Sequence, residues 1–452
     1  MSAKEPATPG GRLGHLLATR DTAAGDPHAR HRSGEMVIGH REALIYTLGK
    51  AAELEHLVMC QYLYAAFSLK TRAEDGVTEE LLPTVQRWRK ELLHIGQQEM
   101  LHLALVQNLL AAVGAAPRLA RPNFPLPPGA FPAGVQIALL PFGEAALRHF
   151  AFLERPEGHD MTDVDEFAAL AKAEELPHEE ADEIGPHLQE FNTIGHLYRS
   201  IENGLGELAR TMGEERLFIG PAQAQATEEH FRWGELVAVR DLRSAAAAID
   251  TIVEQGEGAR GEWRDAHFGR LIRMLDEYME LRAAHPDFNP VRSIQLAHVR
   301  APASGVDVTL IEDAFSARVT DLLNATYEVL LQLLARYFTN NGETPEQLAT
   351  LADVAVGLMY AAIKPLGGVV TRMPIGPGQP DRTIGPAFEL FYDVDYLLPH
   401  RDAAWTLMEE RLREIADLAT RCRDACPVGF LPPVAKVTDA LRAQADRLAA
   451  AR

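Results

Sequence analysis

Two stretches of apolar sequence carry acidic residues where a buried helix would rarely tolerate them. Residues 51–64 read AAELEHLVMCQYLY, and residues 95–106 read IGQQEMLHLALV. A buried carboxylate is costly unless it is paired or binds a metal. In the second stretch Glu99 and His102 are three residues apart, so both project from one side of a helix. The pattern predicts a metal site built from carboxylates and imidazoles between helices.

The Glu-x-x-His step alone is a weak signal, because it occurs at Glu53/His56, Glu91/His94 and Glu99/His102. Its position relative to the apolar stripe of the helix distinguishes the three cases. The stripe of the second stretch runs through Leu92, Ile95, Glu99, His102, Val106, Leu109 and Val113. Glu99 and His102 interrupt this stripe and are expected to bind metal in the core, with a buried hydrogen-bonded pair as the alternative. Glu91 and His94 lie beside the stripe and are expected to be solvated.

Two other helices offer candidate ligands. Glu55 is preferred in the first stretch because it shares a stripe with Met59 and Tyr62, which leaves Glu53 and His56 behind the ligands or at the surface. In the third main helix, Glu202 shares a face with Tyr198, and His196 points partly to another side. Glu202 and His196 are therefore candidate ligands, and hydrogen bonds to neighbouring helices are the alternative.

The fourth helix ends in a glycine-flanked acid, Glu257, and His267 opens the next helix ten residues later. A regular metal-binding bundle places such a Glu and His three apart on one helix. A broken fourth helix would still bring both to one centre, whereas a plain cap or turn residue is the other interpretation of Glu257. Tyr62 and Tyr198 are expected near the centre, as radical relays or substrate hydrogen-bonding groups, or as core packing.

Helical periodicity dominates the chain, so the fold class is expected to be all-α. The predicted helices cover residues 37–70, 79–114, 143–153, 188–212, 245–255, 267–284, 308–340, 345–364 and 402–422. A Pro-rich crossover follows the second helix at 121–129, and Pro-punctuated sequence around 286–305 suggests a domain boundary. We expect a mobile tail at 1–35, a metal-binding bundle at 36–285 and a helical domain at 286–452.

The composition of the chain indicates which binding partners and which cell compartment to expect. The 452 residues carry a net charge of −20, which disfavours nucleic acid and anionic membrane surfaces. No run of apolar residues is as long as a membrane span, and the first 34 residues lack the apolar core of a secretory signal. Three cysteines do not make a disulfide framework, so the cytoplasm is the expected compartment. We interpret Cys422 and Cys426 as packing residues.

The candidate site resembles the ferritin-like domain of the iminophenyl-pyruvate dimer synthase type, found in enzymes of violacein and rebeccamycin pathways. The matching pieces are ELEH at 53–56, YL at 62–63, EMLHL at 99–103, NLLAAVG at 108–114, IG at 194–195 with Tyr198, QGEG at 255–258 and HF at 267–268. The resemblance implies a ferritin-like four-helix bundle with a Pro-rich insert and an additional helical C-terminal region. The pathway enzymes are much longer, and RTIGPAFE at 382–389 is similar to a motif of stand-alone members.

Together these features predict a metal-dependent oxidase or oxygenase of secondary metabolism. Carboxylates with imidazoles suit iron, as one or two ions, or manganese. The expected substrate is a small organic acid or aromatic intermediate, with dioxygen as a possible partner and oxidative coupling of an imino acid as one example. Arg382, in a glycine-rich loop, would reach a substrate carboxylate or lie at the surface. The alternative is a non-catalytic metal-binding or scaffold protein, and a homo-oligomer is open.

Overall fold

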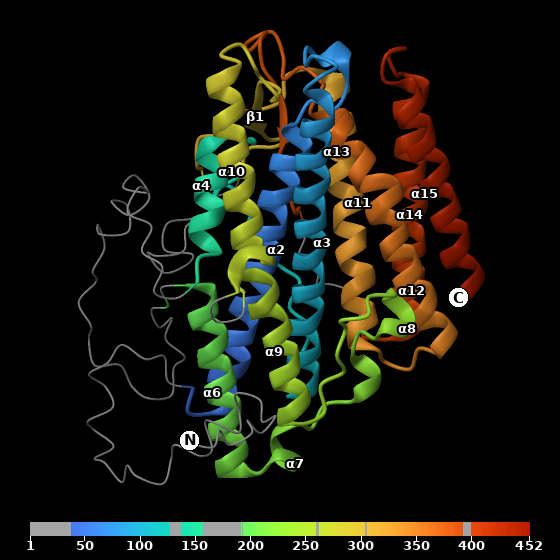
Figure 1. Ribbon diagram of the computed structural model, residues 1–452. Coiled ribbons are helices and arrows are strands. Elements are labelled where there is room, and N and C mark those ends of the chain that lie inside the picture. Colours follow the sequence, from blue (N-terminus) through green and yellow to red (C-terminus); the bar gives the residue numbers. More distant parts are fainter. Residues whose placement is uncertain are drawn as a thin grey trace, which may run out of the picture.

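The computed structural model describes residues 38–126, 137–156, 191, 193–258, 262–302, 305–391 and 399–452. The predicted tail at 1–35 lies outside these residues, as do parts of the Pro-rich crossover and of the predicted helix 188–212. The described chain is predominantly helical, which confirms the all-α class (Figure 1).

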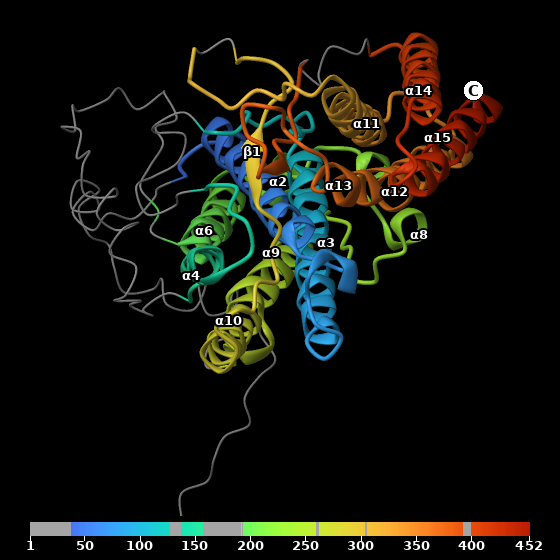
Figure 2. The same ribbon diagram turned by 90° about the horizontal axis from the view of Figure 1, so that it is seen from above.

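Two long antiparallel helices, α2 (Arg41–Ser68) and α3 (Leu82–Ala112), form the centre of the molecule (Figures 1 and 2). The ring of His40 caps α2 by accepting the amide of Ala43 at 3.2 Å. Nearly every α2 residue after Ala51 is buried, because other helices pack on both sides of it. This double burial explains why the sequence of α2 is apolar all round rather than amphipathic.

Four further helices pack on one side of this pair. They stack end to end in two columns, which together with α2 and α3 form a four-helix bundle. They are α4 (Glu144–Leu153), α6 (Ile194–Met212), α9 (Leu242–Gly256) and α10 (His267–Ala284). α4 stands end to end with α6, and α10 with α9, so two of the four columns of the bundle are each broken in the middle (Figure 1). The predicted break between Glu257 and His267 is therefore present, and a second break occurs in the α4–α6 column.

The helix α9 begins three residues before the predicted start at 245. Asp241 caps it, and Ser244 completes a capping box three residues later. The Asp241 carboxylate accepts the Ser244 amide at 2.8 Å. At the other end, Glu257 is the last residue before Gly258, whose φ of +92° stops the helix.

The C-terminal helices pack on the other side of α2 and α3. They are α11 (Ala314–Thr339), α12 (Pro345–Leu358), the π-helical turn η6 (Met359–Ile363), α13 (Lys364–Val370), α14 (Arg401–Asp424) and α15 (Leu431–Ala451). α12, η6 and α13 form one continuous helix that runs six residues beyond the predicted end at 364. α15 was not predicted. The continuous 345–370 helix has the length and apolar composition of a membrane span, but half of its most apolar window is buried in the protein.

A short parallel pair of strands, β1 (Ile294–Ala297) and β2 (Thr383–Pro386), links the two sides. β2 belongs to the RTIGPAFE segment, whose buried Glu389 accepts the amide of Val299 and the side-chain amide of Asn324, each at 2.9 Å. Arg382 is exposed. The segment thus joins β1 to α11.

The remaining described elements are short. They are η3 (Ala73–Asp75), α7 (Glu214–Leu217), η4 (Ala222–Ala224), α8 (Glu228–Phe231) and η5 (Trp263–Asp265).

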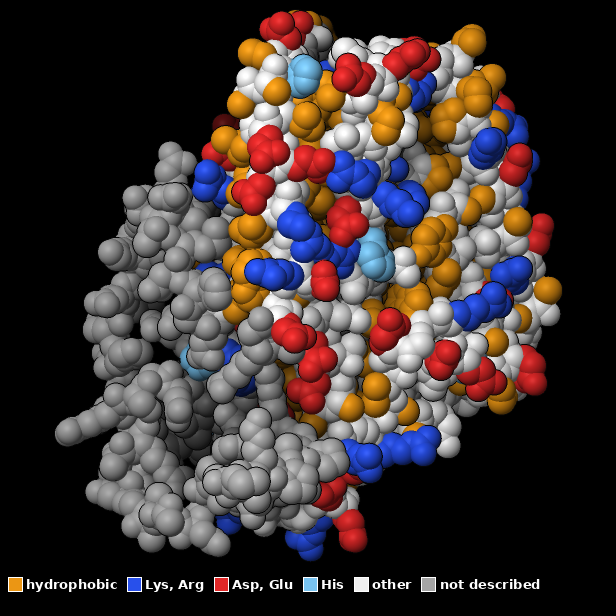
Figure 3. All heavy atoms as spheres, viewed as in Figure 1, with side chains coloured by type: hydrophobic (Ala, Val, Ile, Leu, Met, Phe, Trp, Pro, Cys, Tyr) orange, Lys and Arg blue, Asp and Glu red, His pale blue; other side chains and the backbone are white. Residues whose placement is uncertain are grey.

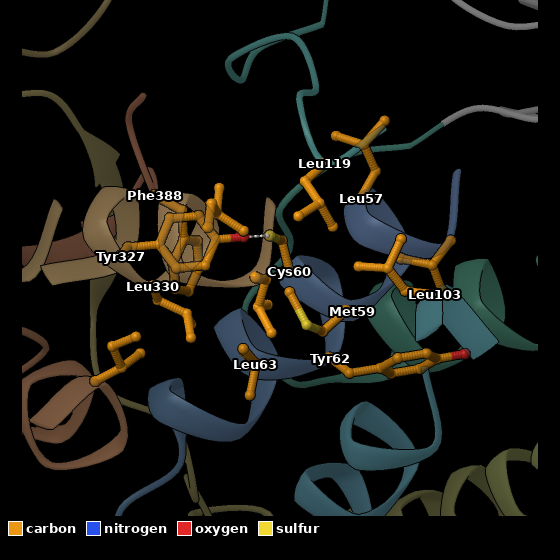
Figure 4. Close-up of a cluster of buried hydrophobic side chains, with 14 of the residues drawn as sticks. Leu57, Met59, Cys60, Tyr62, Leu63, Leu103, Leu119, Tyr327, Leu330 and Phe388 are labelled. Atoms are coloured by element: carbon orange, nitrogen blue, oxygen red, sulfur yellow. Dashed lines mark hydrogen bonds between the residues drawn. The ribbon is translucent and has the colours of Figure 1, made fainter. Parts of the chain in front are cut away.

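One hydrophobic core runs across α2 into both halves (Figure 4). Cys60 of α2 and the hydroxyl of Tyr327 on α11 are 3.4 Å apart, and Tyr62 points from the opposite side of α2. α13 approaches α2 closely at Gly367, where an added Cβ would lie 2.2 Å from the Phe67 ring. α2 is therefore a shared wall between the bundle and the C-terminal helices.

Candidate metal centre

Five buried side chains converge between the four columns of the bundle: Glu55, Glu99, His102, Glu154 and His267. They form two groups, Glu55–Glu99–His102 and Glu99–Glu154–His267. Within each group, one potential ligand atom of every residue lies within 4.8 Å of the others. Glu99 belongs to both groups, so the arrangement has the connectivity of two adjacent metal positions joined by one carboxylate.

Glu99 presents one carboxylate oxygen to each histidine. Its Oε2 is 3.3 Å from Nδ1 of His102, and its Oε1 is 3.0 Å from Nδ1 of His267. A second acid completes each group: Oε2 of Glu55 lies 3.4 Å from His102 Nδ1, and Oε1 of Glu154 lies 3.5 Å from His267 Nδ1. Each imidazole therefore turns one nitrogen toward two carboxylates.

The other nitrogen of each imidazole is held by a glutamine. His102 Nε2 is 3.1 Å from Oε1 of Gln255, and His267 Nε2 is 3.3 Å from Oε1 of Gln98. Arg270 also donates to Gln98 Oε1 at 2.6 Å. This bond fixes the orientation of the Gln98 amide, so that its oxygen faces His267 and accepts from it. Because both Nε2 atoms donate to these carbonyl oxygens, the Nδ1 atoms remain available for a metal, as in the outer shell of known histidine–metal sites.

The helix breaks supply two of the five residues of the cluster. Glu154 is the residue at which α4 ends, and His267 is the first residue of α10. Both therefore lie at the junctions between stacked helices, level with Glu55 and Glu99 on the unbroken pair. Two tyrosines orient the acids: Tyr62 donates to Glu154 Oε1 at 2.6 Å, and Tyr198 donates to Glu55.

Burial and neighbouring charges shift the pKa values of the acids in the cluster. Burial raises the pKa of Glu55 to about 7, and the nearby charge of Glu99 adds to that rise. Burial would also raise the pKa of Glu99, but the charges and hydrogen bonds of His102 and His267 lower it below its usual range. Three carboxylates in one buried place are therefore balanced by positive charge, from imidazolium or from a cation.

The three remaining predicted ligands lie outside both groups. Glu202 is buried on α6, and the half-buried His196 lies six residues earlier, but neither joins Glu99 in a described group. Glu257 accepts from Arg199 at 3.0 Å and sits against Gly195, where an added Cβ would lie 2.1 Å from its Oε1. The IG and QGEG pieces of the sequence therefore lie in contact. The roles of Glu202, His196 and Glu257 as metal ligands remain predictions.

The two look-alike Glu-x-x-His steps lie apart from the cluster. Glu53 pairs with Lys50 at 2.9 Å, and His94 is exposed. His56 faces the C-terminal helices, where its Nδ1 is 2.9 Å from the carbonyl oxygen of Leu119. Glu91 accepts from Arg270, which in turn supports the glutamine behind His267, and its side chain is 37% exposed, as expected for a position beside the stripe.

Sequence reasoning missed Glu154. The residue follows the apolar helix 144–153 and precedes Arg155 and Pro156, so it looked like an ordinary helix end. One signal was present: an acid at a helix C-terminus is unfavourable because it meets the negative end of the helix dipole. A buried acid in that place, at 4% exposure, needs a compensating partner.

The donor set fits a pair of divalent transition-metal ions. Carboxylates with neutral imidazoles suit iron and manganese, and bundles that bind two such ions place Glu and Glu-x-x-His ligands on facing helices. Glu55 on α2 with Glu99 and His102 on α3 reproduces that arrangement, while Glu154 and His267 replace the second half by residues at helix breaks.

Comparison with known proteins agrees with this architecture. The model of the ferritin-like family matches residues 48–276. A dichlorochromopyrrolate synthase from Lentzea aerocolonigenes is 26% identical over 424 residues, covering 87% of this chain and 40% of that protein. A 2-imino-3-(indol-3-yl)propanoate dimerase from Chromobacterium violaceum is 27% identical over 379 residues, covering 78% of this chain and 34% of that protein. The chain thus spans well under half the length of these two relatives.

A solved structure also resembles the chain. A ferritin-like protein from Caulobacter vibrioides is 20% identical, covers 74% of this chain and 96% of its own, and aligns with a TM-score of 0.42.

Proposed function

The chain belongs to the ferritin-like family, and from that premise we propose that its buried cluster holds two iron ions and catalyses oxidation of a small imino or aromatic acid. The observation that carries the proposal is the sharing of Glu99 between two groups of carboxylate and imidazole donors. Iron held by such donors supplies electron transfer and reaction with dioxygen. Manganese is the second candidate metal.

The two relatives suggest the substrate class. Their names state that one makes a chromopyrrolate and the other dimerises an indole-bearing imino acid. Joining two imino acids by one new carbon–carbon bond removes two hydrogen atoms, so two electrons and two protons leave the pair. Dioxygen would accept both and become hydrogen peroxide. Because this chain matches only part of each relative, the same reaction is here a proposal for the bundle.

The chain's own residues provide the setting for that chemistry. A small cavity of about 10 Å³ opens beside Glu154, between α4, α6 and α9, and also touches Tyr198 and Glu257. Burial raises the pKa of Tyr198 well above its usual range, so its hydroxyl keeps a proton and holds the Glu55 carboxylate in place. Arg155 lines the same cavity, whose volume suits about one water molecule.

The test is dioxygen consumption and product formation by the iron-loaded protein. Imino acid would be generated from tryptophan by a separate amino-acid oxidase and passed through a filter before use, and dimer would be detected by mass spectrometry. Glu99→Gln should abolish the activity, and Glu53→Gln, two positions from Glu55 but paired to Lys50, should retain it. Metal binding without oxidation of any imino acid would favour the non-catalytic metal-binding alternative, and no metal binding would favour the scaffold.

A further inference from the structure

A second cavity, of about 390 Å³, lies on the other side of α2 and α3 from the metal cluster. Its apolar walls include Met59 and Leu63 of α2, Met100 and Leu103 of α3, and Leu330 and Leu334 of α11. Figure 4 shows Leu63 and Leu330 on the same side of α2, away from Tyr62. The volume is within the range of roughly 300–1,000 Å³ typical of small-molecule sites.

The mouth of the cavity is basic. Arg89 and Lys90 of α3 line it together with Lys364, the first residue of α13, and Lys90 is exposed to solvent. No carboxylate within the described ranges forms an ion pair with any of these three side chains. Figure 3 shows Lys and Arg side chains beside hydrophobic ones on this face, with Asp and Glu side chains among them.

The half-buried cations favour an anion at this position. Burial lowers the pKa of Arg89, and the charge of Arg292 lowers it further. Burial also lowers the pKa of Lys364, and the neighbouring charge of Arg89 acts in the same direction. Both groups are therefore positive in a place that disfavours positive charge, and a bound carboxylate would relieve both effects.

The helix at the mouth departs from regular geometry. The π-helical turn η6 contributes Met359, Tyr360 and Ile363 to the lining, and the Lys364 amide bonds to the Met359 carbonyl five residues back. Pro365 follows and has no N–H to continue an α-helical ladder. π-Turns inside helices are frequent at functional sites. Here the turn places Tyr360, which is 48% exposed, with its ring centroid 5.8 Å from the Lys364 ammonium.

The inner end of the cavity is lined by neutral polar side chains, with the buried cation of Arg121 behind Tyr327. His56 and Tyr327 line it and bond to each other, and burial lowers the pKa of His56 so that its ring is neutral. Burial also raises the pKa of Tyr327 well above its usual range. A ligand that fits has one anionic end, at the mouth, and an apolar body.

We propose that this cavity binds a monocarboxylate with an elongated apolar tail, of the fatty-acid class. The carboxylate would meet Arg89, Lys90 and Lys364, and the tail would lie between α2, α3 and α11. The site is independent of the metal cluster, because the backbones of α2 and α3 separate the two.

The test is calorimetric titration of the purified full chain with decanoate, with 1-decanol as the uncharged analogue. Decanoate should bind at least tenfold more tightly than decanol, since one charge-assisted hydrogen bond is worth about that much. The double variant Arg89→Gln/Lys364→Met should lose at least tenfold in decanoate affinity and leave decanol binding unchanged. Lys436→Met, which removes an exposed lysine from α15, is the matched control and should change neither.

A cavity-filling variant tests the location of the tail. Ala104→Trp places an indole in the cavity from α3 and should abolish binding of both ligands. If that variant does not fold, as judged by circular dichroism, the charge variants still decide the matter. Absence of decanoate binding, equal affinity for decanol, or full affinity in Arg89→Gln/Lys364→Met would overturn the proposal.

Discussion

Replacement of single carboxylates by glutamine should separate the two metal positions. Glutamine keeps the volume of glutamate and removes its charge, so packing is preserved while an anionic donor is lost. Each group contains two acids. Glu99 is common to both groups, whereas Glu55 belongs to one group only and Glu154 to the other. Glu154→Gln therefore takes one of the two acids from one position only, whereas Glu99→Gln takes one from each.

The number of metal ions that each variant retains should follow from the number of acids lost at each position. Changes behind a metal ligand already weaken binding by roughly 10–100-fold, and loss of a ligand should exceed that range. At a loading concentration a few times above the dissociation constant of the wild-type protein, Glu154→Gln and Glu55→Gln should each keep one ion of two. Glu99→Gln should keep none. Glu53→Gln, on α2 but paired with Lys50 away from the cluster, should keep both.

The assay is elemental analysis after anaerobic loading with ferrous iron and desalting, with circular dichroism to confirm folding. Two ions retained by Glu154→Gln would show that this acid is no ligand. Loss of only one ion from Glu99→Gln would refute the shared carboxylate. Either result would leave the resemblance of the fold intact and remove the geometric argument for a two-metal site.

Two further predictions concern stability. Gly195→Ala should destabilise the protein by about 1–3 kcal/mol in thermal melts, the usual cost of overpacking, because the new Cβ would lie 2.1 Å from the Glu257 carboxylate. The control is Gly368→Ala in α13, where the new Cβ would have no neighbour within 4 Å. This variant should be as stable as wild type or more stable. Burial lowers the pKa of His149 from 6.5 to about 4, and its Nε2 lies 2.9 Å from the amide nitrogen of Gln61, which donates to it. The unfolded chain therefore binds the proton first, and stability should fall as pH drops from 6.5 toward 4, by about 3 kcal/mol more in wild type than in His149→Gln. Parallel pH profiles of urea denaturation would contradict this assignment.

The sequence predicted the part of the site that a single helix can encode. Glu99 and His102 interrupt an apolar stripe, and the period of the helix alone turns both to the core. Glu55 could be preferred over Glu53 by the same reasoning, although α2 is buried on most sides. The ferritin-like fold was implied by the resemblance that these pieces carry, and the family match confirms it.

What escaped prediction depends on contacts between distant segments. Glu154 becomes part of the cluster only because α4 ends where α10 begins, and nothing near Glu154 in the sequence reveals that meeting. The end of the 345–364 helix was placed too early, because a π-turn carries the helix past Pro365, which normally ends one. The boundary near 286–305 stays a prediction, although the bundle and the C-terminal helices share the wall formed by α2.

The broken columns uncouple the helical registers of their two halves. In a continuous helix, one inserted residue rotates every later side chain by about 100° and would misdirect all ligands beyond it. Here one column consists of two separate helices, α4 ending at Leu153 and α6 beginning at Ile194, so the register of one does not fix the register of the other. The orientation of Glu154 at the end of α4 is therefore independent of the register of α6, whereas the candidate ligands on α2 and α3 lie on continuous helices.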